Sequence, residues 1–215
     1  MDVPVNLKNY DEFIETLTCR PVKSGKVLLY SSSFFTRWGY ERAQDQLSAA
    51  TGGKLDIVNH GFGGATIDEL LYYYDRLVKP YAPSVVVTRT GYNDIGNNLS
   101  PEEALFLTQR LIRWLKADFP EVKIFLLPVF DAKIMTPERY ADFRRYNKLL
   151  TDYTANIENV EIFDINPFFY EKSEDIGDLS KLRDVFVSDG LHLTDEAYVE
   201  MAKFFGPRLL AAINK

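Results

Sequence analysis

Short apolar runs alternate with longer amphipathic segments along the chain. Five of these runs are predicted to be strands, because most of their residues are apolar and turn or polar residues bound them. They comprise residues 27–30, 55–59, 84–87, 123–127 and 160–163. Between them, apolar residues recur at helical spacing. Apolar strands separated by helices are typical of a parallel sheet that is buried on both faces.

The intervening segments begin and end at recognisable helix signals. One helix is predicted over residues 7–18 and a second from Trp38 to Ala50, where Thr51, Gly52 and Gly53 follow. Four further helices are predicted to start after capping residues, the first two of which have a glutamate three residues later, as in a capping box: Thr66, Ser100, Thr136 and Thr194. A long loop, about residues 166–187, precedes the last of them.

The order of these elements predicts the fold class. Strand and helix alternate five times, which indicates an α/β fold, a three-layer α/β/α sandwich around a five-stranded parallel sheet with right-handed crossovers. The pattern does not specify the strand order. No linker or repeat interrupts the chain, so residues 1–215 are predicted to form a single domain, with residues 1–25 as an N-terminal helical extension.

Composition narrows the classes of partner. A net charge of −6 without a lysine or arginine cluster argues against nucleic acid or an anionic membrane surface as a partner. The apolar runs are shorter than the ~18 residues of a membrane span. The N-terminus lacks the basic and apolar regions of a secretory signal, so a cytoplasmic location is expected. Cys19 is the single cysteine and is expected to pack as a small hydrophobic residue.

Polar and glycine-rich segments follow the predicted strands. In a parallel sheet these segments meet at one edge, where α/β folds hold their ligands. They are Ser31–Ser33, Gly61–Gly64, Gly91–Asp94 and, after the fifth strand, Asp189–His192. Each has an ordinary structural interpretation as a turn or a surface loop. Together they contain a nucleophile, a base, an orienting acid and oxyanion donors, which are the groups that acyl transfer requires.

The base is the simplest of these groups to assign, because the chain has two histidines. His192 follows Asp189 by three residues, so one turn of chain can bring the carboxylate onto Nδ1. No metal is expected, since two separated histidines and one cysteine form no ligand cluster. No cofactor is expected either, because Thr66 occupies the third glycine position of a G-x-G-x-x-G pattern that begins at Gly61.

The four segments resemble the consensus blocks of the SGNH hydrolases, also called the GDSL esterase/lipase family, over about residues 26–205. Y-S-S-S-F-F-T-R-W is similar to the first block, which implies Ser33 as the nucleophile. N-H-G-F-G-G-A-T and G-Y-N-D are similar to the second and third, which implies that Gly64 and Asn93 join the Ser33 N–H in an oxyanion hole. D-G-L-H matches the fourth block, with Asp189 as the orienting acid and His192 as the base.

The first block departs from the family pattern at one position. Ser31 stands where the family has glycine, and a Cβ there is expected to affect the turn that presents the nucleophile. An alternative register makes Ser32 the nucleophile. The spacing to Trp38 favours Ser33.

The resemblance implies a flavodoxin-like sandwich and a serine esterase that cleaves a small-molecule acyl ester, acetyl or short-chain, through an acyl-enzyme. The alternatives are an inactive carbohydrate- or lipid-binding domain, a lysophospholipase or thioesterase, and a flavodoxin-like nucleotide-binding module. The sequence does not indicate the oligomeric state.

Arg89 is expected to pair with Asp94 or to bind an anionic substrate group. The aromatic residues near the strand ends are expected in the core or around an acyl slot: Phe34, Phe35, Phe130, Phe168, Phe169 and Tyr170.

Overall fold

The protein is built around a five-stranded parallel sheet. The computed structural model describes residues 7–22 and 24–215. The strand order is β2-β1-β3-β4-β5, the flavodoxin-like order. The strands are β1 (Val27–Leu29), β2 (Ile57–Asn59), β3 (Val85–Arg89), β4 (Lys123–Leu127) and β5 (Val160–Ile162). The predicted parallel α/β sandwich is therefore confirmed.

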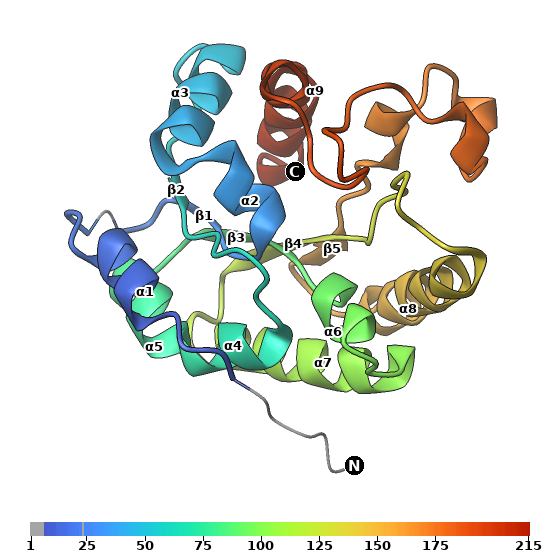
Figure 1. Cartoon of the computed structure of the whole chain (residues 1–215). Helices are drawn as coiled ribbons and strands as arrows, with labels where there is room; N and C mark the ends of the chain where they lie inside the picture. The colour runs from blue at the N-terminus through green and yellow to red at the C-terminus, as the bar shows by residue number, and fades with distance from the viewer. Residues whose placement is uncertain (1–6, 23) are drawn as a thin grey trace.

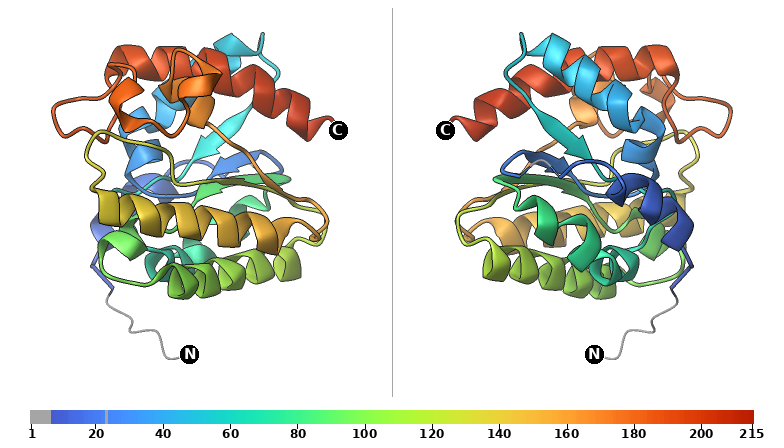
Figure 2. Two further views of the ribbon diagram at one scale, coloured as in Figure 1. Left: turned by 90° about the vertical axis from the view of Figure 1, so that its right-hand side faces the viewer. Right: turned by 90° about the vertical axis from the view of Figure 1, so that its left-hand side faces the viewer.

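Helices cover both faces of this sheet. In Figure 1, the layer above the sheet contains α2 (Ser33–Trp38), α3 (Tyr40–Ala50) and α9 (Asp195–Ile213). The opposite layer contains α1 (Asp11–Thr18), α4 (Ile67–Tyr72), α5 (Tyr74–Leu77), α7 (Pro101–Asp118) and α8 (Pro137–Thr154). Figure 2 shows the sheet edge-on between the two layers.

Shorter elements complete the chain. Helix α6 (Tyr92–Gly96) follows β3. Four single-turn 3-10 helices are η1 (Lys79–Tyr81), η2 (Asn166–Phe169), η3 (Ser173–Asp175) and η4 (Leu179–Lys181). The last three lie within the segment that was predicted to be a long loop. In the described part of the chain, no helix has the length and apolar character that crossing a membrane requires.

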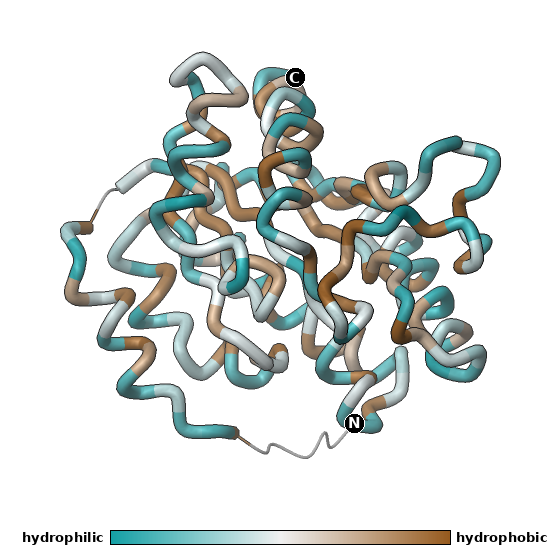
Figure 3. The backbone as a smooth tube through the Cα atoms, turned by 45° about the horizontal axis from the view of Figure 1, so that its top comes forward, coloured by the Kyte–Doolittle hydropathy of each residue, from teal (hydrophilic) through white to brown (hydrophobic). Residues whose placement is uncertain are grey.

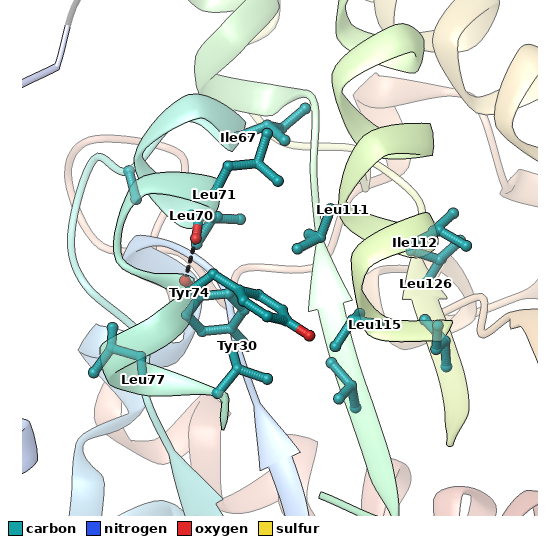
Figure 4. Packing of buried hydrophobic residues seen from close by; sticks show 14 of the residues in the cluster. Tyr30, Ile67, Leu70, Leu71, Tyr74, Leu77, Leu111, Ile112, Leu115 and Leu126 are labelled. Carbon is teal, nitrogen blue, oxygen red and sulfur yellow. Dashed lines mark hydrogen bonds between the residues drawn. The ribbon is translucent and has the colours of Figure 1, made fainter. Parts of the chain in front are cut away.

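Alternate strand residues supply the two halves of the core. Leu29 and Val87 point toward α2 and α9, whereas Leu28 and Val86 point toward α4 and α7, and all four are buried. Figure 3 shows the hydrophobic stretches gathered in the interior and hydrophilic ones on the outer loops. In Figure 4, Tyr30 packs between α4 and α7 and its hydroxyl donates to the Leu70 carbonyl. This hydrogen bond satisfies a polar atom that would otherwise be costly to bury.

The capping predictions are confirmed. The Thr66 N–H donates to Glu69 Oε2 at 2.8 Å, which forms half of a capping box at α4. Ser100 and Glu103 form the same box at α7. These caps satisfy N–H groups that have no partner within their own helices.

Two helix boundaries differ from prediction. Helix α1 begins at Asp11 rather than residue 7, because Asn9 Oδ1 accepts the Asp11 N–H at 2.9 Å and makes an Asx turn. Residues 1–6 of the predicted extension lie outside the described residues. The helix predicted from Trp38 to Ala50 begins at Tyr40 instead, as α3, because Gly39, with φ of +81°, separates it from α2. Helix α2, which begins at Ser33, is not predicted from the pattern.

The structure also tests the predicted packing of Cys19 and of the aromatic residues near the strand ends. Cys19 is exposed, so the expectation that it packs as a hydrophobic residue is wrong. The six aromatic residues near the strand ends are all buried in the core on the α2 and α9 side of the sheet. Their interpretation as core residues is therefore confirmed.

Candidate active site

Three of the polar segments are joined by hydrogen bonds at the carboxyl edge of the sheet. Ser31 Oγ donates to the Arg89 carbonyl at 2.5 Å, which links the ends of β1 and β3. The Phe62 N–H donates to the Ser31 carbonyl at 3.0 Å, and Asn93 Nδ2 donates to the Ala65 carbonyl at 2.7 Å. Residues that are 28 or more positions apart in the sequence thus form one framework.

The three consecutive serines differ in exposure. Ser31 is 0% exposed and Ser32 is 4% exposed, whereas the side chain of Ser33 is half-buried. The backbone φ of Ser31 is negative, so its position does not require glycine. Its Cβ is therefore accommodated, and its hydroxyl holds the β3 backbone. Of the three hydroxyl groups, the Ser33 hydroxyl is the best placed to meet a substrate.

Two glycines bring the second segment close to α2. A Cβ on Gly61 would lie 2.6 Å from Phe35 Cβ, so glycine is required for the loop to pack against the helix. Gly64 has φ of +75°, a conformation that glycine favours. In the described residues, neither the Ser33 N–H nor the Gly64 N–H has a hydrogen-bond acceptor. Both donors remain free for a ligand oxygen.

The third segment forms α6, although it was predicted to be a loop. Gly91 begins it with φ of +89°, and a Cβ there would lie 2.5 Å from the Tyr146 ring. Asn93 is bonded to Ala65, next to Gly64. Asp94 Oδ1 accepts the Ile67 N–H at 2.8 Å. These two side chains fix α6 against the loop that carries Gly64.

The burial of Asp94 predicts a pH dependence of stability. Asp94 is 2% exposed, and burial raises the pKa of its carboxyl group from 3.8 to about 7. Between these values the folded chain retains a proton that the unfolded chain has lost, so the free energy of unfolding falls as the pH rises. At about 1.4 kcal/mol per pKa unit, the decline is up to ~4 kcal/mol. Above pH ~7 the contribution of Asp94 is constant.

Asp94→Asn is expected to remove this decline, because the amide stays neutral and keeps an oxygen for the Ile67 N–H. Urea unfolding of both proteins at about pH 4.5 and about pH 7.5 measures the effect. Equal declines in the two proteins would show that Asp94 is ionised in the fold across this range.

The fourth segment forms a compact acid–base pair. Asp189 Oδ1 accepts the N–H groups of Leu191 and His192 at 2.9 Å each, and Oδ2 lies 2.6 Å from His192 Nδ1. The three-residue spacing is therefore what allows one carboxylate to hold both the backbone and the ring. With Nδ1 donating to the carboxylate, Nε2 is the basic nitrogen.

These contacts keep the Asp189 carboxyl group ionised. Burial would raise the pKa of its carboxyl group, but the hydrogen bonds from the His192 ring and from the two N–H groups outweigh it and lower the pKa to about 2. The group is an anion at neutral pH. It can therefore orient His192 and stabilise a protonated ring.

Helix α9 connects this pair to α2. The Tyr198 hydroxyl donates to the Phe34 carbonyl at 2.8 Å, and the Tyr198 and Trp38 rings pack with centroids 5.5 Å apart. No hydrogen bond joins Ser33 Oγ to His192 Nε2, which is buried and has no partner among the described residues. The Asp189–His192 pair and Ser33 are therefore linked through the packing of α9 against α2, without a direct hydrogen bond.

Sequence reasoning missed a contribution from the N-terminal segment. Lys8 Nζ donates to the Gly64 carbonyl at 3.2 Å, and a Cβ on Gly64 would lie 3.4 Å from the Tyr10 hydroxyl. Both residues were placed in a predicted helix. No local signal identifies a contact with a loop more than 50 residues away.

Arg89 lacks the ion pair expected for it. Asp94 binds the Ile67 N–H, and Arg89 Nε and Nη1 have no partner within the described residues. The predicted Arg89–Asp94 salt bridge is therefore wrong. Across residues 7–22 and 24–215, no three histidine, cysteine or acidic side chains are grouped so that they could bind a metal ion.

Comparison with known proteins identifies related sequences and folds. The sequence model of the GDSL-like Lipase/Acylhydrolase family matches residues 30–199. None of the curated proteins matches the chain. A GDSL-like lipase from Bacteroides thetaiotaomicron shares 17% identity and a TM-score of 0.71, covering 95% of this chain and 98% of that one.

Two esterase structures share the fold as well. An acetyl xylan esterase has 19% identity and a TM-score of 0.67, with coverage of 87% of this chain and 98% of its own. A carbohydrate esterase family 3 protein from Talaromyces cellulolyticus has 15% identity and a TM-score of 0.63, with coverage of 88% and 98%. At these identities the likeness establishes a common fold.

Proposed function

The chain belongs to the GDSL-like lipase/acylhydrolase family and is a carboxylic ester hydrolase, and we propose that it cleaves small acyl esters through a Ser33–His192–Asp189 triad. The observation that carries this proposal is the 2.6 Å contact between Asp189 Oδ2 and His192 Nδ1. With Nδ1 donating to the carboxylate, the lone pair of the neutral ring is on Nε2, which has no partner in the described structure and is the nitrogen that a general base uses.

The proposed reaction has two halves. His192 Nε2 takes the proton of Ser33 Oγ as the oxygen attacks the acyl carbon, and the same ring then protonates the leaving alcohol. The resulting acyl-enzyme is hydrolysed by water, with His192 again as the base. In both halves the oxyanion accepts hydrogen bonds from the Ser33 N–H, the Gly64 N–H and the Asn93 side-chain amide.

A short acyl group is the proposed substrate class. Phe34, the residue after Ser33, is 2% exposed, and its ring packs against Phe130 and Tyr198. These rings fill the core beside the site and do not form a slot for a long chain. The similar folds of an acetyl xylan esterase and of a carbohydrate esterase favour acetylated sugars as candidates.

Covalent labelling tests the proposed nucleophile. A fluorophosphonate probe is expected to modify Ser33 in the wild-type protein, because such probes react with serines that a base has activated. Peptide mapping identifies the site, and a p-nitrophenyl ester series from acetate to decanoate, run beside acetylated xylan, defines the substrate. An unlabelled protein that hydrolyses none of these compounds would favour the inactive binding domain instead.

Asn93→Ala is expected to lower kcat by ~10²–10³ with a small change in KM, because an oxyanion donor acts mainly in the transition state. Steady-state kinetics on p-nitrophenyl acetate measures both constants. Asn97→Ala, at an exposed position directly after α6, is the matched control. A kcat within a few-fold of wild type, in a variant that unfolds at the wild-type temperature, would remove Asn93 from the oxyanion hole.

A further inference from the structure

Arg89 ends β3 in an unusual environment. The residue is 3% exposed, and its guanidinium carbon lies 4.5 Å from the Phe130 ring centroid, 5.3 Å from that of Tyr92 and 5.5 Å from that of Phe34. These aromatic rings favour a positive charge. They do not replace the oxygen acceptors that guanidinium N–H groups require. Nε and Nη1 are buried and have no such acceptor in the described part of the chain.

The charge of Arg89 is retained despite its burial. Burial lowers the pKa of the guanidinium to about 10, so the group is a cation at neutral pH. A buried cation is ordinarily paired with an anion, because removal from water is costly without compensation. Asp94, the acidic residue close to it in sequence, binds the Ile67 N–H instead. The fold therefore holds a cation whose anion is not supplied by the described residues.

The guanidinium lies next to the proposed catalytic groups. Phe34 follows Ser33 in the sequence, and Tyr92 precedes Asn93. Burial raises the pKa of Tyr92, while the charge of Arg89 lowers it and that of Asp189 raises it. Both charges therefore act on the same ring. Tyr92 is half-buried, whereas Phe34 and Phe130 are buried, so of these three rings the Tyr92 ring is the one that contacts solvent.

We propose that Arg89 binds an oxyanion of the substrate, such as a carboxylate, so that the preferred ester carries a negative charge near its scissile bond. This inference rests on the proposed function and deepens it. The planar guanidinium presents its donors in a fork that matches a carboxylate or phosphate. The anion would satisfy the unpartnered N–H groups and neutralise the buried charge.

Matched esters test this preference in the wild-type protein. Monomethyl succinate and methyl butyrate differ by a carboxylate on the acyl side, and 4-acetoxybenzoate and phenyl acetate differ by one on the alcohol side. In at least one pair, the anionic ester is expected to have a kcat/KM about 10- to 100-fold higher, as a hydrogen bond to a charged group provides. The pair of esters that shows this preference indicates whether the anion that Arg89 binds is on the acyl side or on the alcohol side.

Substitution of Arg89 assigns the preference to this residue. Arg89→Met is expected to lower the anionic-to-neutral ratio of kcat/KM by about 10- to 100-fold, and Arg89→Lys to lower it less. Arg37→Met removes an exposed positive charge from α2 and is expected to keep the wild-type ratio. A ratio that falls equally in Arg37→Met would assign the preference to the general field of the surface and overturn the proposal.

A measurement on the wild-type protein covers the case in which the Arg89 variants do not fold. Succinate is expected to inhibit hydrolysis of the neutral esters competitively, and succinamide is not. If neutral esters are hydrolysed, anionic ones are no better and succinate does not inhibit, the inference is overturned and the proposed function stands. If no ester is hydrolysed and the fluorophosphonate does not label Ser33, both are overturned.

Discussion

Ser33→Ala is expected to lower kcat by ~10⁶ while the fold is unchanged, because the variant has no nucleophile and retains only binding and oxyanion stabilisation. The side chain of Ser33 is half-buried and donates no hydrogen bond to the described residues, so its removal should not shift the thermal midpoint. The measurement is the steady-state hydrolysis of p-nitrophenyl acetate, with circular dichroism as the test of folding.

The matched control is Ser32→Ala. Ser32 is 4% exposed and is the N-cap of α2, but its side chain makes no capping hydrogen bond. Its substitution is expected to leave kcat near the wild-type value. The reverse result, with activity lost in Ser32→Ala and kept in Ser33→Ala, would move the nucleophile to Ser32.

A double variant tests whether Ser33 and His192 act in one step. Residues that act as a unit are not additive in their kinetic effects. The Ser33→Ala/His192→Ala protein is therefore expected to be about as active as Ser33→Ala alone. If the fold losses in kcat of the two single variants multiply in the double variant, the two side chains contribute independently.

The sheet and most helices could be predicted because their signals are local. The apolar run from Lys123 to Leu127 matches β4 without error, and Ser100 with Glu103 marks the start of α7. A strand or a cap is specified by neighbouring residues, through burial and through hydrogen bonds to the nearest N–H groups. The strand order depends on contacts between distant segments, and the pattern does not contain it.

The errors have tertiary causes instead. The serines after β1 are typical of a turn, yet Ser33 begins a helix because Phe34, Phe35 and Trp38 bury one face of it in the core. Tertiary burial here overrides the weak helix propensity of serine. The expected Arg89–Asp94 pair failed because the Ile67 N–H, from a different element, occupies the carboxylate.

The candidate site could be predicted where the spacing itself encodes the geometry. A carboxylate three residues before a histidine can bond both its N–H and its ring, and Asp189 does so. The contact of Lys8 with Gly64 has no such signature, because tertiary contacts between distant segments bring the two residues together, among them the hydrogen bond from the Lys8 N–H to Glu69 Oε1 at 2.7 Å. The unpartnered state of Arg89 likewise exists only in three dimensions.

Asp189→Asn is expected to lower kcat/KM by ~10⁴, the second largest effect, through the wrong tautomer of His192. The asparagine oxygen can still accept the N–H groups of Leu191 and His192 that Asp189 Oδ1 holds. Its amide nitrogen, however, would face Nδ1 and donate a hydrogen bond to it. The proton of the neutral ring would then be on Nε2, so Nε2 could not accept the Ser33 proton. Fluorophosphonate labelling of Ser33 should slow in parallel with hydrolysis. Asp184→Asn, at an exposed position five residues before Asp189, is the matched control, and equal activity in the two variants would refute the role of Asp189.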